Sequence, residues 1–355
     1  MTPVGALVWL ALISCLAVSC GDVGTEKAGG PGQQPSHHGP RGFRNPHLPD
    51  RGRTGDFFRW RLGLGPEEKP AWPPGEVPSY RPRVVSPDLA RLKNPDPRSL
   101  QVTWIGHATF LIQAGGLNIL TDPMFSERAS PVSFAGPKRL LPPGVPFQEL
   151  PHLDAVVISH NHYDHLDTAT VQRLGPGPRF FVPLGLGAWF QDLGLKNVQE
   201  MDWWQSAALG PVRFVSVPAQ HFSQRTPFNH NQSLWCGWVL QTPGGSVFFA
   251  GDTGYSPDFR EIGARLGPPR LSLIPIGGYQ PRWFMRTMHL NPPEAVRVHR
   301  DLGSRQSIGM HWGTFRLTDE PLGEPPLYLE KALRDAGLPC EEFITLGLGE
   351  TRSFP

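Results

Sequence analysis

The sequence has few cysteines, only four in 355 residues. Beyond the first 20 positions there are just Cys236 and Cys340, which are too few and too distant to define a disulfide framework or a cysteine-bound zinc site. Net charge is also scarce, because 33 basic residues nearly balance 31 acidic ones and leave a formal charge of +2. No general electrostatic field therefore draws the chain to nucleic acid, and we expect no nucleic-acid partner.

Long apolar runs are missing as well. The uncharged run from Val4 to Val18 is shorter than the roughly 20 residues that span a bilayer, so it predicts a signal peptide over residues 1–20. Small residues before Cys20 resemble a bacterial lipoprotein signal, with Cys15 as a second candidate, although no Lys or Arg precedes the run. We expect an exported protein of the bacterial cell envelope, anchored by lipid on Cys20.

Glycine and proline are abundant, with 40 and 41 residues, and part of the excess lies in the first hundred positions. Residues 21–55 combine Gly, Pro, His and Arg without apolar periodicity, which predicts a disordered linker. Its histidines, His37, His38 and His47, receive no role. The rest of the chain, 56–355, is predicted to form one hydrolase domain.

From Leu100 onward, short β-branched and aromatic runs alternate with Gly, Pro and occasional amphipathic helices. This pattern is typical of an α/β domain. The predicted strands are 101–104, 109–113, 117–121, 154–159, 212–217, 234–241, 247–250, 271–275, 307–310 and 343–346, and the predicted helices are 188–193, 257–265, 292–301 and 326–336.

The strongest motif directly follows the predicted buried strand that ends at Ser159. It runs His160-Asn161-His162-Tyr163-Asp164-His165 and places four potential metal ligands within six residues. Buried imidazoles and carboxylates are costly unless they are hydrogen-bonded or metal-bound. Zinc accepts both imidazole nitrogen and carboxylate oxygen at about 2 Å, so this loop predicts a metal site.

Three more candidate ligands, His221, Asp252 and His311, each follow a predicted strand. Side chains at the ends of several strands can surround one cleft. Together with the loop they supply seven ligands, enough for two metal ions with positions left for water or substrate. The pattern predicts a binuclear hydrolytic centre.

These motifs carry a family resemblance. The His-x-His-x-Asp-His loop, the later histidines and the Gly-Asp-Thr-Gly around Asp252 resemble the metallo-β-lactamase superfamily. Longer stretches are similar to its N-acyl-phosphatidylethanolamine phospholipase D family, namely residues 104–109, 136–139, 181–185, 279–285 and 311–315. The resemblance covers roughly residues 95 to 353.

The resemblance implies an αββα sandwich, two zinc ions and an active-site histidine, His289, outside the metal shell. It implies a hydrolase that releases N-acylethanolamine and phosphatidic acid, with Asp164 also orienting the nucleophile, and it implies a homodimer. The implied ligand sets are His160, His162 and His221 for one zinc, Asp164, His165 and His311 for the other, and Asp252 as the bridge.

Other functions stay open at this point. The same centre could cleave a lactone, a β-lactam or another phosphodiester, and a non-catalytic zinc- or lipid-binding envelope protein could keep the fold. His107 is expected to hydrogen-bond within the core. A phospholipid substrate requires a membrane surface, for which the candidates, equally suited to core packing, are Phe57, Phe58, Trp60, Trp283 and Phe284.

Overall fold

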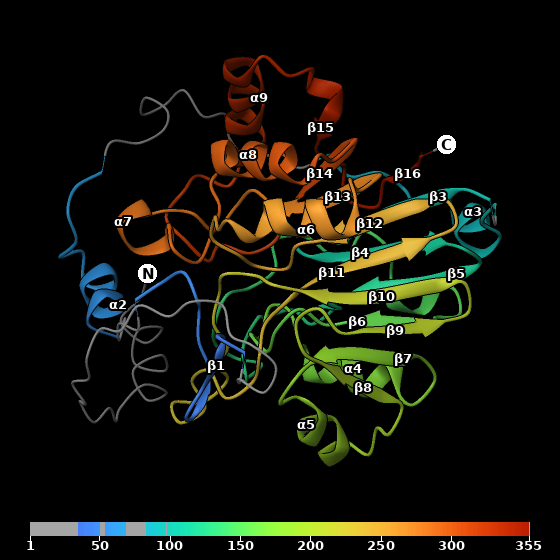
Figure 1. Ribbon diagram of the computed structural model, residues 1–355, viewed down its shortest axis with the longest axis horizontal. Helices are drawn as coiled ribbons and strands as arrows, with labels where there is room; N and C mark the ends of the chain where they lie inside the picture. Colours follow the sequence, from blue (N-terminus) through green and yellow to red (C-terminus); the bar gives the residue numbers. More distant parts are fainter. Residues whose placement is uncertain (1–34, 50–53, 69–82, 97, 355) are drawn as a thin grey trace.

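A computed structural model describes residues 35–49, 54–68, 83–96 and 98–354 of the chain. In these ranges two seven-stranded sheets dominate the molecule (Figure 1). The first sheet has the order β16 (Thr351–Phe354), β3 (Leu100–Gly106), β4 (Thr109–Ala114), β5 (Leu117–Thr121), β6 (Ala155–Val157), β7 (Arg179–Pro183) and β8 (Val198–Met201). The second has the order β15 (Phe343–Ile344), β14 (Gln306–Met310), β13 (Leu271–Pro275), β12 (Gly245–Phe249), β11 (Gly237–Thr242), β10 (Val212–Val217) and β9 (Ser206–Leu209).

The two sheets are built alike. In the first, β16 through β5 pair antiparallel and β5 through β8 pair parallel. In the second, β9 through β12 pair antiparallel and β12 through β15 pair parallel. Parallel neighbours need crossover connections, and these connections carry the helices and the long loops.

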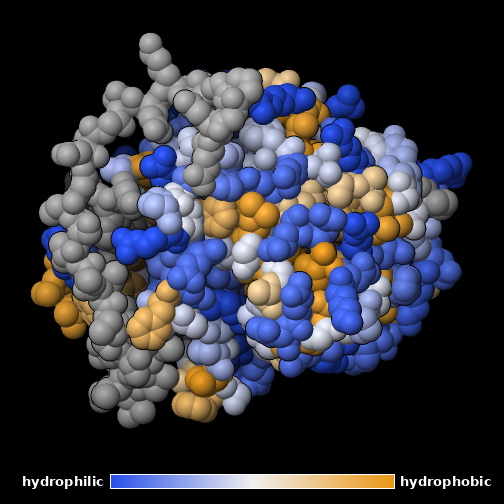
Figure 2. Space-filling model, turned by 60° about the horizontal axis from the view of Figure 1, so that its bottom comes forward, coloured by the Kyte–Doolittle hydropathy of each residue, from blue (hydrophilic) through white to orange (hydrophobic). Residues whose placement is uncertain are grey.

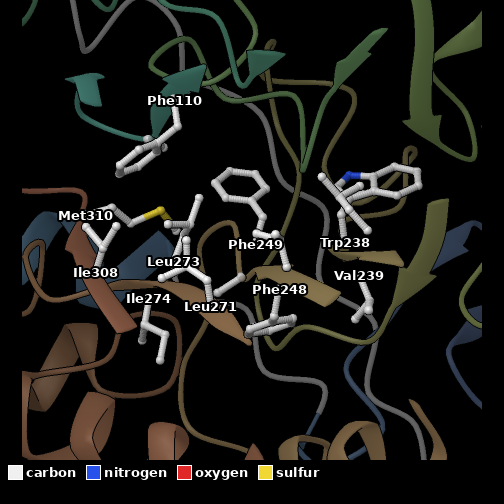
Figure 3. Close-up of a cluster of buried hydrophobic side chains, with 14 of the residues drawn as sticks. Phe110, Trp238, Val239, Phe248, Phe249, Leu271, Leu273, Ile274, Ile308 and Met310 are labelled. Carbon is white, nitrogen blue, oxygen red and sulfur yellow. The ribbon is translucent and has the colours of Figure 1, made fainter. Parts of the chain in front are cut away.

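The main core lies between the sheets. Side chains alternate along each strand, so Phe110 of β4 belongs to the core between the sheets while its neighbour Leu111 belongs to the cluster on the outer face. Figure 3 shows Phe110 pointing towards Phe249 and Leu273 of the second sheet. The period of two, visible in the sequence, thus decides which residues join the two sheets.

Helices cover both outer faces. The helices α3 (Leu89–Lys93), α4 (Thr168–Leu174) and α5 (Gly187–Asp192) place Leu92, Val171 and Phe190 against the first sheet. On the second sheet lie α6 (Asp258–Leu266), α8 (Pro292–Leu302) and α9 (Glu324–Ala336), which appear beside it in Figure 1. The αββα sandwich is therefore confirmed.

Local sequence signals set the ends of α8. Asn291 accepts a hydrogen bond from the backbone N–H of Glu294, whose side chain accepts from the Asn291 N–H, and Pro292 occupies the first helical position. The helix ends at Gly303, which has a φ of 65°. The sequence prediction of 292–301 differs from the observed helix by one residue.

Residues 35–49 correct the linker prediction. They form a small hairpin, β1 (His38–Gly39) and β2 (Gly42–Phe43), and His37 is only 6% exposed. The prediction of a disordered linker was wrong for these residues, because their histidines and Asn45 hydrogen-bond to the domain. The predicted signal peptide and residues 21–34 lie outside the described residues.

Two further helices lie at one end of the molecule. The helix α2 (Thr54–Arg61) contacts the short helix α7 (Arg282–Met285), and both appear at the left of Figure 1. No helix in the described part of the chain is long and apolar enough to cross a membrane. On the face shown in Figure 2, hydrophilic residues predominate and apolar residues form separate patches.

Candidate metal centre

The seven predicted ligands converge at one edge of the sandwich. The loop 160–165 follows β6, and the single ligands His221, Asp252 and His311 come after β10, β12 and β14. These strands belong to two different sheets, so only the sandwich brings the ligands together. The structure thus brings the seven predicted ligands together.

One group consists of His160, His162 and His221. The Nδ1 atom of His162 lies 2.8 Å from His160 Nε2 and 3.3 Å from His221 Nε2. Three imidazole nitrogens within such distances can bind a single ion. The Nδ1 atom of His221 lies 3.0 Å from the carbonyl oxygen of Met288, and donation to this oxygen leaves Nε2 as the ligand atom.

A second group consists of Asp164, His165 and His311. The Oδ2 atom of Asp164 lies 3.3 Å from His165 Nε2 and 3.5 Å from His311 Nε2. These residues, together with His107, form another cluster that can hold an ion. The residues of each implied ligand set thus lie in one cluster, and the two clusters adjoin, since His160 and His165 also form a cluster with Asp122.

Asp252 lies between the groups. Its Oδ2 atom is 3.2 Å from His165 Nε2 and 3.1 Å from His311 Nε2, and it is 4.0 Å from His160 Nε2 and 3.8 Å from His221 Nε2. One carboxylate oxygen thus faces imidazoles of both groups. This is the position that a bridging ligand requires.

The electrostatics suit cation binding. Burial lowers the pKa of His162 to about 4 and that of His107 to about 3, so these imidazoles are neutral at pH 7. Burial, the largest single effect, opposes protonation of His311, but the carboxylates of Asp252 and Asp164 together outweigh it and raise the pKa of His311 to about 9. Without a cation, protonated imidazoles therefore balance the carboxylates, and a metal ion would replace those protons.

Several buried polar atoms of the centre have no hydrogen-bond partner among the described residues. They are His165 Nε2, Asp252 Oδ1 and both ring nitrogens of His311. Burying a polar atom without a partner costs about 1–3 kcal/mol, and such atoms at a ligand cluster are explained by an ion. The residues present therefore fit the metal that the fold implies.

Asp122 is a site residue that the sequence analysis missed. This fully buried carboxylate lies 2.7 Å from His165 Nδ1, and it accepts hydrogen bonds from the Ser159 backbone N–H at 2.7 Å and the Ser159 hydroxyl at 2.5 Å. It thereby orients the imidazole of His165 and turns its Nε2 atom towards the centre. A carboxylate directly after the predicted strand 117–121 was the signal that could have identified it.

Arg225 was missed as well. Its guanidinium donates to the carbonyl oxygens of Asn161 at 2.8 Å and Leu166 at 2.7 Å, and it lies 4.1 Å from the ring centre of Tyr163. The Tyr163 hydroxyl in turn donates to the Arg225 carbonyl oxygen at 2.8 Å. Arg225 therefore connects the loop after His221 to the loop 160–165, and it fixes the relative position of two segments that carry metal ligands.

The structure places two further histidines at the centre. His107, expected to hydrogen-bond within the core, instead has its Nε2 atom 2.9 Å from Asp164 Oδ2 and so belongs to the centre. His289 lies beside the bridging Asp252, with its Nδ1 atom 3.9 Å from Asp252 Oδ2, and its side chain is 16% exposed. It stands where the metal groups meet solvent.

A third cluster, His37, His38 and Asp202, also has the composition of a metal site. The two Nε2 atoms lie 2.6 and 2.8 Å from different oxygens of the Asp202 carboxylate. Each imidazole thus pairs with its own oxygen of one carboxylate, and these two hydrogen bonds account for the contacts of this cluster.

The family now follows from comparison with known proteins. A family model described as Beta-lactamase superfamily domain matches residues 117–312. The chain belongs to the metallo-β-lactamase superfamily, as a member similar to N-acyl-phosphatidylethanolamine phospholipase D, and it is a metal-dependent hydrolase. The solved metallo hydrolase Igni18 of Ignicoccus hospitalis shares the fold, with a TM-score of 0.57, 22% identity and coverage of 72% of this chain and 99% of that one.

Individual curated relatives relate the chain to particular members of the superfamily. An N-acyl-phosphatidylethanolamine-hydrolyzing phospholipase D of Caenorhabditis elegans is 43% identical over 271 residues, which are 71% of this chain and 75% of the relative. A mitochondrial protein of the same description from Saccharomyces cerevisiae is 36% identical, over 71% of this chain and 55% of the relative. A metal-dependent hydrolase of Methanopyrus kandleri is 29% identical over 69% of this chain and 96% of the relative.

Proposed function

We propose that this chain is a zinc-dependent phosphodiesterase that hydrolyses N-acyl-phosphatidylethanolamine to N-acylethanolamine and phosphatidic acid. The observation that supports the proposal is the pair of ligand groups on either side of Asp252. They occur in a chain that is 43% identical to a protein named for this reaction. Water adds to phosphorus, and the phosphorus–oxygen bond on the ethanolamine side breaks.

The two ligand groups would each hold one zinc ion, and Asp252 would contact both. Two such cations make a hydroxide nucleophile available at a pH of about 7 and neutralise charge on phosphoryl oxygens. Zinc is proposed from the ligand chemistry, since imidazole and carboxylate donors suit it.

The protein's own residues hold and orient the reactants. The contact with His107 fixes the carboxylate of Asp164, which we assign to orienting the attacking water as well as to metal binding. His289 has a ring nitrogen without a hydrogen-bond partner among the described residues, and it lies at the solvent side of the centre. We assign it to the phosphate or to the departing ethanolamine oxygen.

A phospholipid substrate also requires contact with a membrane. The aromatic side chains of α2 and α7 pack on one another, with Trp60 and Phe284 ring centres 5.3 Å apart. Beyond α2, Leu62 and Leu64 are 69% and 64% exposed, and Arg61 beside them is exposed too. We propose that this end of the molecule meets the lipid surface, since exposed apolar side chains flanked by arginine suit an anionic interface.

The test is mass spectrometry of the products formed from N-acyl-phosphatidylethanolamine by zinc-loaded protein, beside Asp164→Asn and beside lactone and simple phosphodiester substrates. Both expected products should appear only with the intact site. Hydrolysis of a lactone or another phosphodiester instead would move the function elsewhere in the superfamily. Zinc binding without any hydrolysis would support a non-catalytic envelope protein.

Three further proposals concern the whole protein. We propose export to the cell envelope, a lipid anchor on Cys20 and a homodimer. Mass spectrometry of the mature chain from its native host tests the anchor, and an unmodified residue before Cys20 would contradict it. Light scattering of purified protein tests the dimer.

A further inference from the structure

Residues 35–49, named here the N-terminal strap, form hydrogen bonds to the domain near both of their ends. At one end, His37 and His38 hydrogen-bond to Asp202, at 2.6 and 2.8 Å. At the other end, His47 Nε2 lies 3.0 Å from Asp258 Oδ1. The strap lies outside residues 117–312, which match the superfamily domain.

Between its two ends the strap contacts a metal ligand. The Asn45 side-chain amide donates to the carbonyl oxygen of His221 at 2.7 Å, and its Oδ1 atom accepts from the His221 backbone N–H at 3.1 Å. One amide thus satisfies both backbone groups of a single residue, as a neighbouring strand would. His221 lies in a segment without regular structure beyond the end of β10, so its own sheet supplies no such pairing.

The strap also contacts the loop that begins at His221. The backbone N–H of Phe43 donates to the carbonyl oxygen of Asn231 at 2.8 Å, and the Asn231 N–H donates to the carbonyl of Ser223 at 2.8 Å. Gly42 has a φ of 135°, and a Cβ atom there would lie 2.1 Å from the Asn231 carbonyl oxygen. Only glycine allows this close approach, so the backbone of the strap packs directly against the backbone of the loop.

We infer that Asn45 is a positioning residue for the metal centre, which holds His221 where it completes the ligand group with His160 and His162. The inference rests on the metal centre of the proposed function. The backbone of His221 sets the place of the imidazole, and the contact with Met288 sets only its rotation. Loss of the Asn45 amide therefore removes both side-chain hydrogen bonds to the backbone of one ligand in one group and leaves the group around Asp164 intact.

The experiment measures bound zinc per chain and its affinity by chelator competition, for the wild type and for Asn45→Ala, Asn45→Asp and Arg41→Ala. Asn45→Ala should lower the affinity for one of the two zinc ions about 10- to 100-fold, which is the usual effect of removing a group that orients a ligand. Asn45→Asp keeps an acceptor for the His221 N–H but sets a carboxylate oxygen against the His221 carbonyl, so it should also weaken binding of the same ion. Arg41→Ala is the matched control, because Arg41 is exposed on the same strap and should change neither ion.

The outcomes separate this inference from the proposed function. Two zinc ions of unchanged affinity in Asn45→Ala would overturn the inference alone. Fewer than two zinc ions in the wild type would overturn the two-metal centre itself. Equal weakening of both ions, or the same loss in Arg41→Ala, would also refute the assignment of Asn45 to His221. Thermal unfolding of the metal-free variants serves as the folding control, and Asn45→Asp keeps the test available if Asn45→Ala does not fold.

Discussion

Replacing Asp122 by Asn should damage the metal centre without removing any of its ligands. The substitution keeps the shape of the side chain but removes its charge and gives it an amide N–H₂ group. In the structure this carboxylate lies 2.7 Å from His165 Nδ1 and accepts two hydrogen bonds from Ser159. An amide can still accept on one side, but on the other side its N–H₂ group would face a donor.

The expected magnitude follows from these contacts. Loss of a carboxylate that orients a metal-bound imidazole costs about 10- to 100-fold in metal affinity or activity. Because Asp122 is fully buried, one unsatisfied donor also costs about 1–3 kcal/mol of stability. We therefore expect zinc binding at the group of His165 to weaken 10- to 100-fold and turnover to fall at limiting zinc.

The assay is chelator competition for zinc, with unfolding in urea as the stability control. Asp154→Asn is the matched variant, because Asp122 follows β5 and Asp154 accepts a hydrogen bond from the N–H of Asn118, near the other end of β5, at 2.8 Å. It should lower stability slightly and leave zinc affinity unchanged. Wild-type zinc affinity in Asp122→Asn, or an equal loss in both variants, would refute the reasoning.

Three other predictions concern stability and accessibility. The contact with Asp258 raises the pKa of His47 above its ordinary 6.5, so its stabilisation is present below pH 6.5 and lost as the pH rises through the raised pKa. Because this side chain is 38% exposed, the unfolding free energy of His47→Gln should be lower than that of wild type by less than about 1 kcal/mol near pH 5.5. This difference in unfolding free energy should shrink by about pH 8.5. A difference that grows with pH would contradict the prediction. A thiol reagent followed by peptide mass spectrometry should modify the exposed Cys340 in the native protein but not Cys236, whose pKa is raised by burial; equal labelling would contradict the packing. Phe110→Ala, which empties a fully buried position between the sheets, should lower the unfolding free energy by about 3–5 kcal/mol in urea, and a loss below about 1 kcal/mol would show that the core refills.

Much of the fold could be predicted because its signals are local. The strand 212–217 was recognised from its β-branched and aromatic run, and the helix predicted over 292–301 from a proline near its first turn, Pro292. The strands β8 and β9 were missed, since Val198–Met201 and Ser206–Leu209 are short and only partly buried, and their sheet pairing rather than their sequence holds them in place. The helix α4 was missed as well, because its seven residues are too few to show a helical period.

The metal ligands could be predicted for a different reason. His160 to His165 form a dense motif, and His221, Asp252 and His311 each follow a recognisable strand, so the chemistry was readable even before the geometry was known. The residues that orient them were not readable in this way. Asp122 and Asn45 contact ligands 43 and 176 positions away, and no local pattern marks such pairs.

The sequence by itself determined the class of fold and the set of ligands, because alternation, turn residues and ligand types are properties of short segments. Only the tertiary structure decided how those ligands divide into two groups around Asp252 and which residues orient them. It also decided that the segment around Asn45 belongs to the domain, although its composition resembles a spacer. The physical reason is that hydrogen bonds between distant segments form only once two sheets and their loops have packed together.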